Sequence, residues 1–192
     1  SFMLDTLMEG YGTDETEDQD RKDIFVQGIT VVPSEDGADN KYIVIDGQQR
    51  TTFFYLLLKT LGDDKIITII YNSSRGASAT DVSPQLWLNN FSSKTDCTEN
   101  ISEPTQDVYF FKKTVRLIKE HVLFKANHEK LITYIRKHVR FLLIPIPASL
   151  AVSTFTMMNG NKAMMEDYEL IKADLLRRAS LGTGGYSNST AR

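Results

Sequence analysis

The sequence predicts an α+β fold, with strands concentrated in the first part of the chain and helices dominating the rest. Short runs rich in β-branched and aromatic residues alternate with turn-forming clusters up to about residue 71, whereas apolar residues recur at steps of three and four after residue 107. Of the 192 residues, 41% are hydrophobic and 24% are charged. These values are typical of a globular chain that is long enough to bury a core.

The first predicted elements are two strands joined by a hairpin-like loop. Residues 24–32, IFVQGITVV, and residues 41–46, KYIVID, are rich in branched and aromatic side chains, and the cluster PSEDGADN between them is typical of a turn. The acidic run GTDETEDQD at 12–20 predicts a solvated loop or a frayed helix end, and we assign it no chemistry.

A buried helix and a third strand follow. The segment TTFFYLLLKTL at 51–61 is apolar on all sides, which predicts a buried helix, and Gly62 stands where a C-cap is expected. The segment KIITIIY at 65–71 predicts a strand. Serine, threonine, asparagine and aspartate then dominate residues 72–103 around an isolated LWLNNF, which predicts a long connection between two halves.

Helices dominate the second half. An apolar stripe predicts an amphipathic helix that starts at Asp107 and contains Val108, Phe111, Val115, Ile118 and Val122. A second helix is predicted at 128–138, then a strand at 139–146, and then two helices separated by a turn at Asn159 and Gly160. We expect one domain over residues 1–192, with an α/β core (1–72), a connecting excursion (73–103), a helical part with one strand (104–180) and a flexible tail (181–192).

Composition excludes several function classes. The net charge is −3 and the isoelectric point is near 5.6, so the chain lacks the general basic excess of nucleic-acid-binding domains, and any DNA contact must be local or indirect. The single cysteine, Cys97, can form neither an internal disulfide nor a zinc knuckle. No apolar run reaches the ~18 residues of a membrane span, so we expect a cytoplasmic protein that does not contact a membrane.

The strongest candidate for chemistry is the DGQQR loop (residues 46–50), where a predicted strand passes directly into a helix. Gly47 permits a sharp turn, and the first helical turn presents unpaired backbone N–H groups at the positive end of the helix dipole, which favours an anion such as phosphate. Arg50 adds a planar fork that can hold two phosphate oxygens, and Thr51 and Thr52 add hydroxyl groups.

The other residues of the loop suit acid–base chemistry. Gln48 and Gln49 can orient a water or read a base, and Asp46 can position a hydrated metal or accept a proton. The predicted catalytic residues are Asp46, Gln48 and Gln49, the predicted metal ligand is Asp46, and the predicted phosphate ligands are Gly47, Arg50 and Thr51. A structural alternative stays open, in which the loop is an ordinary turn, Arg50 pairs with Asp46 and Thr51 caps the helix.

A strand that ends in IDGQQR, followed by threonines and a leucine-rich helix, resembles the hallmark of the N-terminal domain of GmrSD-type restriction endonucleases. The family's later signature is matched in order by Phe155, Asn159, Gly160, Glu169 and the segment LIKA at 170–173. The segment VYFFKKTV at 108–115 is similar to a helix with a Tyr-x-x-Phe pattern in that family, so the resemblance extends over roughly residues 24–176.

The resemblance implies a ParB/sulfiredoxin-like α/β core with a helical C-terminal annex. It also implies that Asn159 and Lys172 close the nucleotide site from the helical side, with hydrogen bonds and a point charge beside Arg50. Each of the two residues has an ordinary alternative, because Asn159 and Gly160 are a common turn pair and Lys172 can pair with Glu169 on one helix face.

On this resemblance we expect a domain that binds a nucleoside triphosphate with Mg²⁺ or another divalent ion and hydrolyses it. Turnover would regulate a His-Asn-His nuclease, encoded downstream or in a partner, that acts against phage DNA carrying modifications, so that this chain contacts DNA only indirectly. Two alternatives remain, namely a module that senses a nucleotide or modified DNA without turnover, and a structural domain in which the DGQQR loop is a packed turn. We assign no nuclease centre to this chain, because its histidines, His121, His128 and His138, lie in predicted helices.

Overall fold

The fold was analysed in a computed structural model that describes residues 2–34, 41–63, 68–71, 83–95 and 105–160. The chain divides into two compact units, residues 1–146 and residues 147–192. The described residues form a mixed α/β structure with six α-helices and a three-stranded sheet. No helix among them is long and apolar enough to cross a membrane.

The first unit contains most of the described elements, with the boundaries α1 (Phe2–Tyr11), β1 (Ile24–Pro33), β2 (Tyr42–Asp46), α2 (Gln48–Leu61), α3 (Pro84–Asn90), α4 (Gln106–Glu120), α5 (His128–His138) and β3 (Val139–Pro145). Short 3-10 helices lie at Asp18–Asp20 (η1) and Val122–Lys125 (η2). In the second unit, the 3-10 helix Ala148–Leu150 (η3) leads into α6 (Ala151–Gly160).

The sheet has β1 in the middle, in the order β2-β1-β3. β2 runs antiparallel to β1, with Thr30 opposite Asp46, and β3 runs parallel to β1, with Ile24 opposite Val139. The register of β1 shifts on both sides, which marks bulges that bend a strand locally. The antiparallel pair brings the end of β2, and therefore the start of α2, beside the middle of β1.

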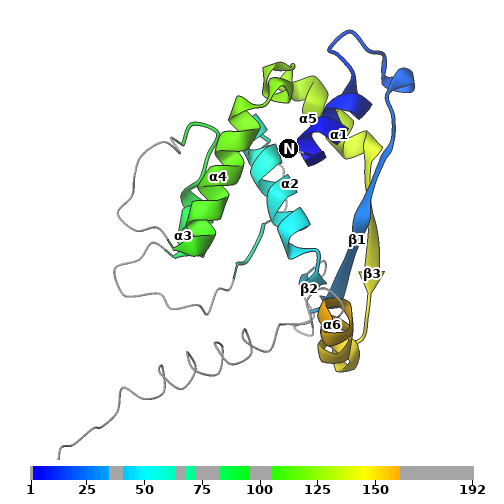
Figure 1. Cartoon of the computed structure of the whole chain (residues 1–192), viewed down its shortest axis with the longest axis vertical. Helices are drawn as coiled ribbons and strands as arrows, with labels where there is room; N and C mark the ends of the chain where they lie inside the picture. Colours follow the sequence, from blue (N-terminus) through cyan, green and yellow to red (C-terminus); the bar gives the residue numbers. More distant parts are fainter. Residues whose placement is uncertain (1, 35–40, 64–67, 72–82, 96–104, 161–192) are drawn as a thin grey trace, which may run out of the picture. The chain divides into compact units, whose positions relative to one another are not determined.

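Four helices of the first unit pack together beside the long β1 and β3 pair, as Figure 1 shows for α1, α2, α4 and α5. Apolar residues at helical spacing supply the core because they line one face of each helix. The fully buried side chains at this core include Leu4, Leu7, Tyr11, Leu56, Leu57, Val115, Leu131 and Tyr134. α1 was not predicted from the sequence, although Leu4, Leu7 and Tyr11 stand at steps of three and four.

Local sequence explains where the helices begin and end. The N-caps Thr105 and Asn127 accept hydrogen bonds from the backbone N–H groups of Val108 and Lys130, as threonine and asparagine commonly do. α2 ends at Gly62, whose left-handed conformation (φ 89°) lets its N–H donate to the carbonyls of Leu58 and Lys59. The helices predicted at 51–61, 107–122 and 128–138 are therefore confirmed, with shifted boundaries.

Two predicted elements are wrong within the described residues. Residues 68–71 form no strand, because the Gln85 side chain accepts a hydrogen bond from the Tyr71 N–H and donates one to the Ile69 carbonyl at 3.2 Å. A side chain therefore satisfies backbone groups that a neighbouring strand would have paired. The turn predicted at Asn159 and Gly160 is replaced by helix, since α6 includes both residues.

Candidate functional site

The backbone of the DGQQR loop has the strand-to-helix form that the sequence predicts. β2 ends at Asp46, Gly47 adopts a left-handed conformation (φ 94°, ψ 10°), and α2 begins at Gln48. A Cβ on Gly47 would lie 3.2 Å from Ile29 Cγ1 and 3.3 Å from Ile29 Cα. Glycine is therefore favoured at this position both by the backbone conformation and by the close approach of β1.

Within the part of the chain that the structure describes, no side chain caps the N-terminus of α2. Gly47 is its N-cap, no side chain there accepts a hydrogen bond from the first turn, and the first helical bond runs from the Thr51 N–H to the Gly47 carbonyl at 2.9 Å. The backbone N–H groups of Gln48, Gln49 and Arg50 precede that bond, at the positive end of a 14-residue helix. This end of α2 is electrostatically suited to an anion.

The Arg50 guanidinium already has protein acceptors. Its Nη1 donates to Gln27 Oε1 at 2.8 Å, and its Nη2 donates to the Gly28 carbonyl at 2.7 Å and to Asp46 Oδ2 at 3.1 Å. The side chains of Arg50 and Asp46 are 21% and 19% exposed, so this ion pair is largely shielded from water. The pairing of Arg50 with Asp46, which the sequence left open as an alternative, is present in the structure.

One nitrogen of the same guanidinium has no hydrogen-bond acceptor among the described residues. Arg50 Nε is buried, and no acceptor lies within hydrogen-bonding distance of it among the residues that the structure describes. A buried donor without a partner is costly, so its presence at this loop favours a role for Arg50 beyond packing.

The neighbouring side chains of the loop make local contacts. Gln48 Nε2 donates to the Val44 carbonyl at 3.1 Å, and Thr51 Oγ1 donates to the Gly47 carbonyl at 3.0 Å. The side chains of Gln48 and Gln49 are exposed, whereas that of Thr51 is partly buried. Thr51 therefore hydrogen-bonds back to the carbonyl of the N-cap, and the two glutamines are open to solvent at the same helix end.

The composite site with Asn159 and Lys172 stays a prediction. Asn159 lies at the end of α6, in the second unit, and its side chain is outside what the structure describes, as is the whole of Lys172. The structure therefore brings together Asp46, Gly47, Gln48, Gln49, Arg50 and Thr51 from the predicted set.

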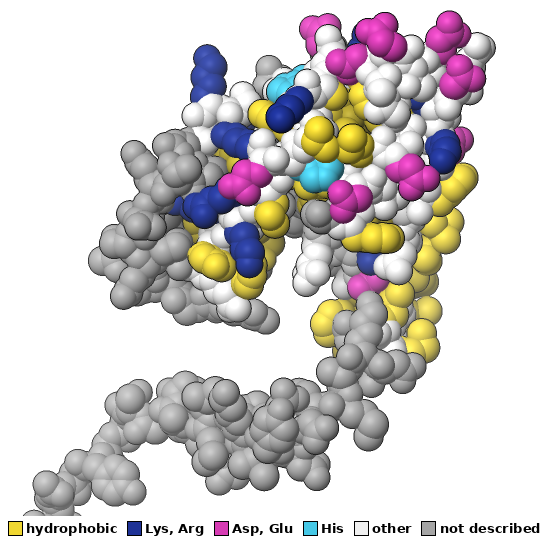
Figure 2. Space-filling view, turned by 45° about the horizontal axis from the view of Figure 1, so that its top comes forward, with side chains coloured by type: hydrophobic (Ala, Val, Ile, Leu, Met, Phe, Trp, Pro, Cys, Tyr) yellow, Lys and Arg dark blue, Asp and Glu magenta, His cyan; other side chains and the backbone are white. Residues whose placement is uncertain are grey.

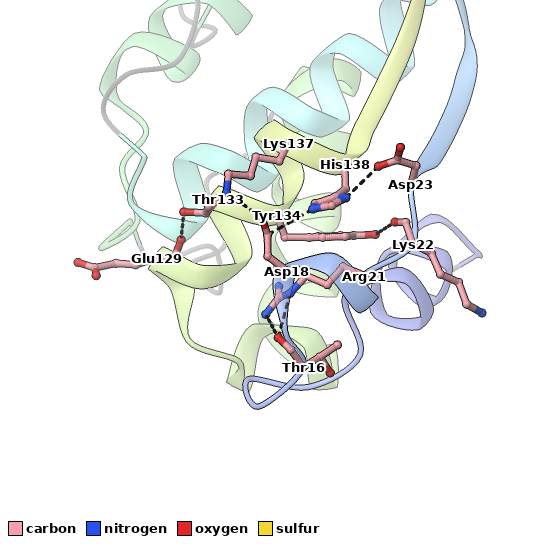
Figure 3. A network of polar contacts seen from close by, with 10 residues as sticks. All are labelled: Thr16, Asp18, Arg21, Lys22, Asp23, Glu129, Thr133, Tyr134, Lys137 and His138. Atoms are coloured by element: carbon pink, nitrogen blue, oxygen red, sulfur yellow. Dashed lines mark hydrogen bonds and ion pairs between the residues drawn. The ribbon is translucent and has the colours of Figure 1, made fainter.

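A second polar cluster, which was not predicted from the sequence, lies between the N-terminal segment and α5 (Figure 3). Asp18 accepts a hydrogen bond from Lys137 Nζ at 2.8 Å and contacts His138 Nε2 at 3.3 Å, while His138 Nδ1 contacts Asp23 at 2.8 Å. The hydrogen bonds from Lys137 and His138 hold the pKa of Asp18 below its ordinary value. The pairing of an acidic run with the basic last turn of α5 joins distant segments, so no local pattern showed it.

A shallow cavity of 370 Å³ opens beside this cluster, with the lining residues Asp18, Arg21, Glu129, Lys130, Thr133 and Lys137. Arg21 lies over the Tyr11 ring at 4.1 Å and donates through Nη2 to the Thr16 carbonyl at 3.1 Å. Lys130 Nζ donates to the Asp14 carbonyl at 2.7 Å. None of the residues of the DGQQR loop lines the cavity, so we treat the cluster as a contact that holds the N-terminal segment.

The histidines make structural contacts. His121 Nδ1 accepts a hydrogen bond from the Leu123 N–H and caps η2, and its Nε2 lies 2.9 Å from Asp5. His128 Nε2 lies 3.0 Å from the Phe124 carbonyl. Across the residues that the structure describes, no three His, Cys, Asp or Glu side chains are grouped so that they could hold a metal ion.

Comparisons with known proteins give one result. Residues 3–176 match the family described as "GmrSD restriction endonuclease, N-terminal domain". Comparisons with curated proteins and with solved structures gave no match. The matched range contains the DGQQR loop and all the described helices except the first residue of α1.

Proposed function

This chain belongs to the family of GmrSD restriction endonuclease N-terminal domains, and from that membership we propose that it is the nucleotide-binding regulatory domain of a modification-dependent restriction system. The DGQQR loop is the proposed site for the phosphates of a nucleoside triphosphate. The proposal extends to a ParB/sulfiredoxin-like core, to phage defence in the cytoplasm, and to a His-Asn-His nuclease, downstream or in a partner, through which DNA is reached.

The observation that carries the proposal is the position of Arg50. Arg50 belongs to the first turn of α2, where the uncapped N–H groups of the helix favour an anion, and its guanidinium lies beside Asp46, directly before that helix. A guanidinium that can make two parallel hydrogen bonds binds phosphate with more geometric specificity than an ammonium group does. In this proposal the N-terminus of α2 and the Arg50 guanidinium therefore bind the same anion.

The contacts of Arg50 suggest how a phosphate would be accommodated. Arg50 is held by Asp46 at 3.1 Å and by the Gly28 carbonyl at 2.7 Å, so its charge is partly neutralised when no ligand is bound. A phosphate that approaches the start of α2 competes with Asp46 for the guanidinium. When the fork turns to the phosphate, Asp46 loses its partner and becomes available for a second role.

That second role is the predicted binding of a divalent ion or a proton. Mg²⁺ is commonly bound through one or two carboxylates together with substrate phosphates and waters, so Asp46 beside a triphosphate fits this mode. Such an ion would neutralise charge that develops on the phosphates. Gln48 and Gln49, which are exposed at the same helix end, would orient the attacking water.

A sensor without turnover is the second candidate, and one observation favours it. Arg50 also donates to Gln27 and Gly28 in β1, so its release by a phosphate would change contacts of the central strand without any reaction. A ligand that binds only one of two arrangements shifts their populations. In this version the bound nucleotide itself controls the partner nuclease.

Nucleotide-dependent melting tests the binding step. Each of the four ribonucleoside triphosphates, with Mg²⁺, is added to the wild-type protein and to Arg50→Ala, Arg50→Lys and Arg140→Ala. At a hundred times Kd a ligand stabilises the fold by about 2.7 kcal/mol, and we expect this gain to vanish in Arg50→Ala and to shrink in Arg50→Lys. Arg140, an exposed arginine of β3, serves as the matched control, and its variant should keep the full gain. The absence of stabilisation in the wild-type protein would refute the proposal.

Phosphate release from wild type and Asp46→Asn separates hydrolysis from sensing. The amide keeps the size of the side chain and removes its charge, so nucleotide should still bind while turnover falls by about 100-fold or more if Asp46 is the general base. Wild-type turnover in the Asn variant removes Asp46 from the mechanism. Binding without turnover in both proteins assigns the domain to the sensor class.

A further inference from the structure

The outer face of α4 carries apolar residues that the core does not use. Tyr109 is 52% exposed, Phe110 is 49% exposed and Leu117 is 46% exposed. The rings of Tyr109 and Phe110 meet edge to face, with their centroids 5.4 Å apart. Contiguous exposed apolar side chains on one helix face mark an interaction surface more often than isolated ones do.

Two cations interleave with these rings. Lys113 is four positions after Tyr109, and Arg116 is three positions after Lys113, so all three follow one side of the helix, and both cations are exposed. Figure 2 shows dark blue and yellow side chains next to one another over this part of the molecule. The opposite face of α4 is the one that packs into the core, through Val108, Phe111, Val115 and Ile118.

The charge of this face is opposite to that of the protein. The chain as a whole carries a net charge of −3, whereas the outer face of α4 presents Lys113 and Arg116, with the exposed carboxylate of Glu120 at its C-terminal end. The chain as a whole therefore does not attract polyanions, and any electrostatic attraction of a polyanion is local to the outer face of α4. Protein interfaces are usually depleted in lysine at their apolar centre, which makes an anionic ligand the better fit.

We propose that the outer face of α4, formed by Tyr109, Phe110, Lys113, Arg116 and Leu117, binds single-stranded nucleic acid. Bases stack on the Tyr109 and Phe110 rings, and the backbone phosphates lie near Lys113 and Arg116. Aromatic rings interleaved with cations are the usual composition of single-strand binding surfaces, because every base has a face that can stack.

The geometry favours a single strand over a duplex. The bases of a duplex are stacked on one another. Exposed rings on the convex surface of α4 therefore cannot reach the faces of these bases unless the duplex is opened. Positions 109–117 extend about 12 Å along α4, which is enough for only a few nucleotides. The surface is distinct from the DGQQR loop and goes beyond the proposed nucleotide site. It would give this chain a direct contact with single strands, in addition to the indirect contact with DNA through the proposed nuclease.

Fluorescence anisotropy with the full chain tests the proposal, using labelled twelve-residue oligothymidylate, oligodeoxyadenylate and a duplex of the two. Both single strands should bind more tightly than the duplex. The variants Tyr109→Ala and Phe110→Ala should each weaken single-strand binding by about tenfold, while Tyr109→Phe, which keeps the ring, should bind like the wild type.

The salt dependence tests the cations. With two phosphates neutralised on a single strand, the logarithm of the affinity should fall with the logarithm of the salt concentration with a slope of about −1.4, and Lys113→Ala should reduce that slope by about 0.7. Lys22→Ala is the matched control, since Lys22 is an exposed lysine outside α4, and it should leave the slope unchanged. Trp87 fluorescence of each variant checks that the core is intact, because Trp87 is buried in it.

Three outcomes would overturn the proposal. One is binding that depends on Lys113 and not on the rings, which would show general attraction to polyanions. A second is equal or tighter binding of the duplex. A third is displacement of the oligonucleotide by polyglutamate at equal charge concentration, which would assign the face to an acidic protein partner.

Discussion

Gly47→Ala tests whether the turn between β2 and α2 requires a residue without a side chain. The substitution places a Cβ at φ 94°, which costs an L-residue roughly 1–2 kcal/mol. The added Cβ would also lie 3.2 Å from Ile29 Cγ1 and 3.3 Å from Arg50 Nη2, and crowding of this kind typically costs about 1–3 kcal/mol. We expect a loss of about 2–5 kcal/mol in the free energy of unfolding.

Gly62→Ala is the matched control. Gly62 lies at the other end of the same helix with nearly the same backbone (φ 89°, ψ 21°), but a Cβ there would meet no atom of the described residues within 4 Å. Both substitutions reduce the conformational entropy of the unfolded chain equally, so this effect on stability cancels when the two variants are compared. Gly47→Ala should therefore be less stable than Gly62→Ala by about 1–3 kcal/mol, which is the contribution of the crowding alone.

Urea unfolding measured by tryptophan fluorescence gives both values. The chain has one tryptophan, Trp87, which is 6% exposed and stacks on Phe91 at 4.9 Å, so its emission reports the core of the first unit. Equal midpoints for the two variants would refute the crowding argument. Since the new Cβ also contacts Arg50, Gly47→Ala should lose nucleotide-dependent stabilisation, whereas Gly62→Ala should keep it.

Three further predictions concern ion pairs and pH. Arg136→Met should lower the free energy of unfolding by about 1–3 kcal/mol and Arg136→Lys by less, measured by urea titration, because Asp63 is buried and accepts hydrogen bonds from Arg136 at 2.7 and 3.0 Å. Asp18 has a lowered pKa, so its contribution to stability is present above about pH 4 and is lost as the pH falls further; Asp18→Asn should flatten the acid limb of a plot of urea midpoint against pH. Burial raises the pKa of Tyr134 to about 12, so stability should fall as the pH rises from about 10 to 12, and Tyr134→Phe should remove this decline in melting temperature.

The elements with a strong local signal could be predicted from the sequence. The predicted stripe determines which side of α4 is buried, and the structure buries Val108, Phe111, Val115 and Ile118. Its last member, Val122, lies beyond the end of α4 in η2 and is exposed. Gly47 similarly marks the turn between a strand and a helix, because few other residues adopt its conformation. In both cases the physical cause lies within a few residues of the chain.

What could not be predicted depends on partners far away in the sequence. The segment at 65–71 has the composition of a strand, yet Gln85 satisfies the backbone at Ile69 and Tyr71, and no local pattern indicates that contact. The same holds for the site. The anion-favouring end of α2 is visible in the sequence, but the contacts of Arg50 with Gln27 and Gly28 depend on the pairing of β1 with β2.

The parallel pairing of β1 with β3 has a consequence for synthesis of the chain. Thr30 pairs with Ile144, so the middle strand of the sheet cannot complete its hydrogen bonding until almost the whole first unit has left the ribosome. At a translation rate of about 5–20 residues per second, roughly 6 to 22 seconds pass between the synthesis of β1 and that of β3, and one edge of β1 stays unpaired during this time. During that interval β1 and β2 form a two-stranded hairpin, which is only marginally stable alone. We expect nascent chains stalled before residue 139 to bind chaperones and to aggregate when released. Chains stalled well beyond residue 146 should neither bind chaperones nor aggregate.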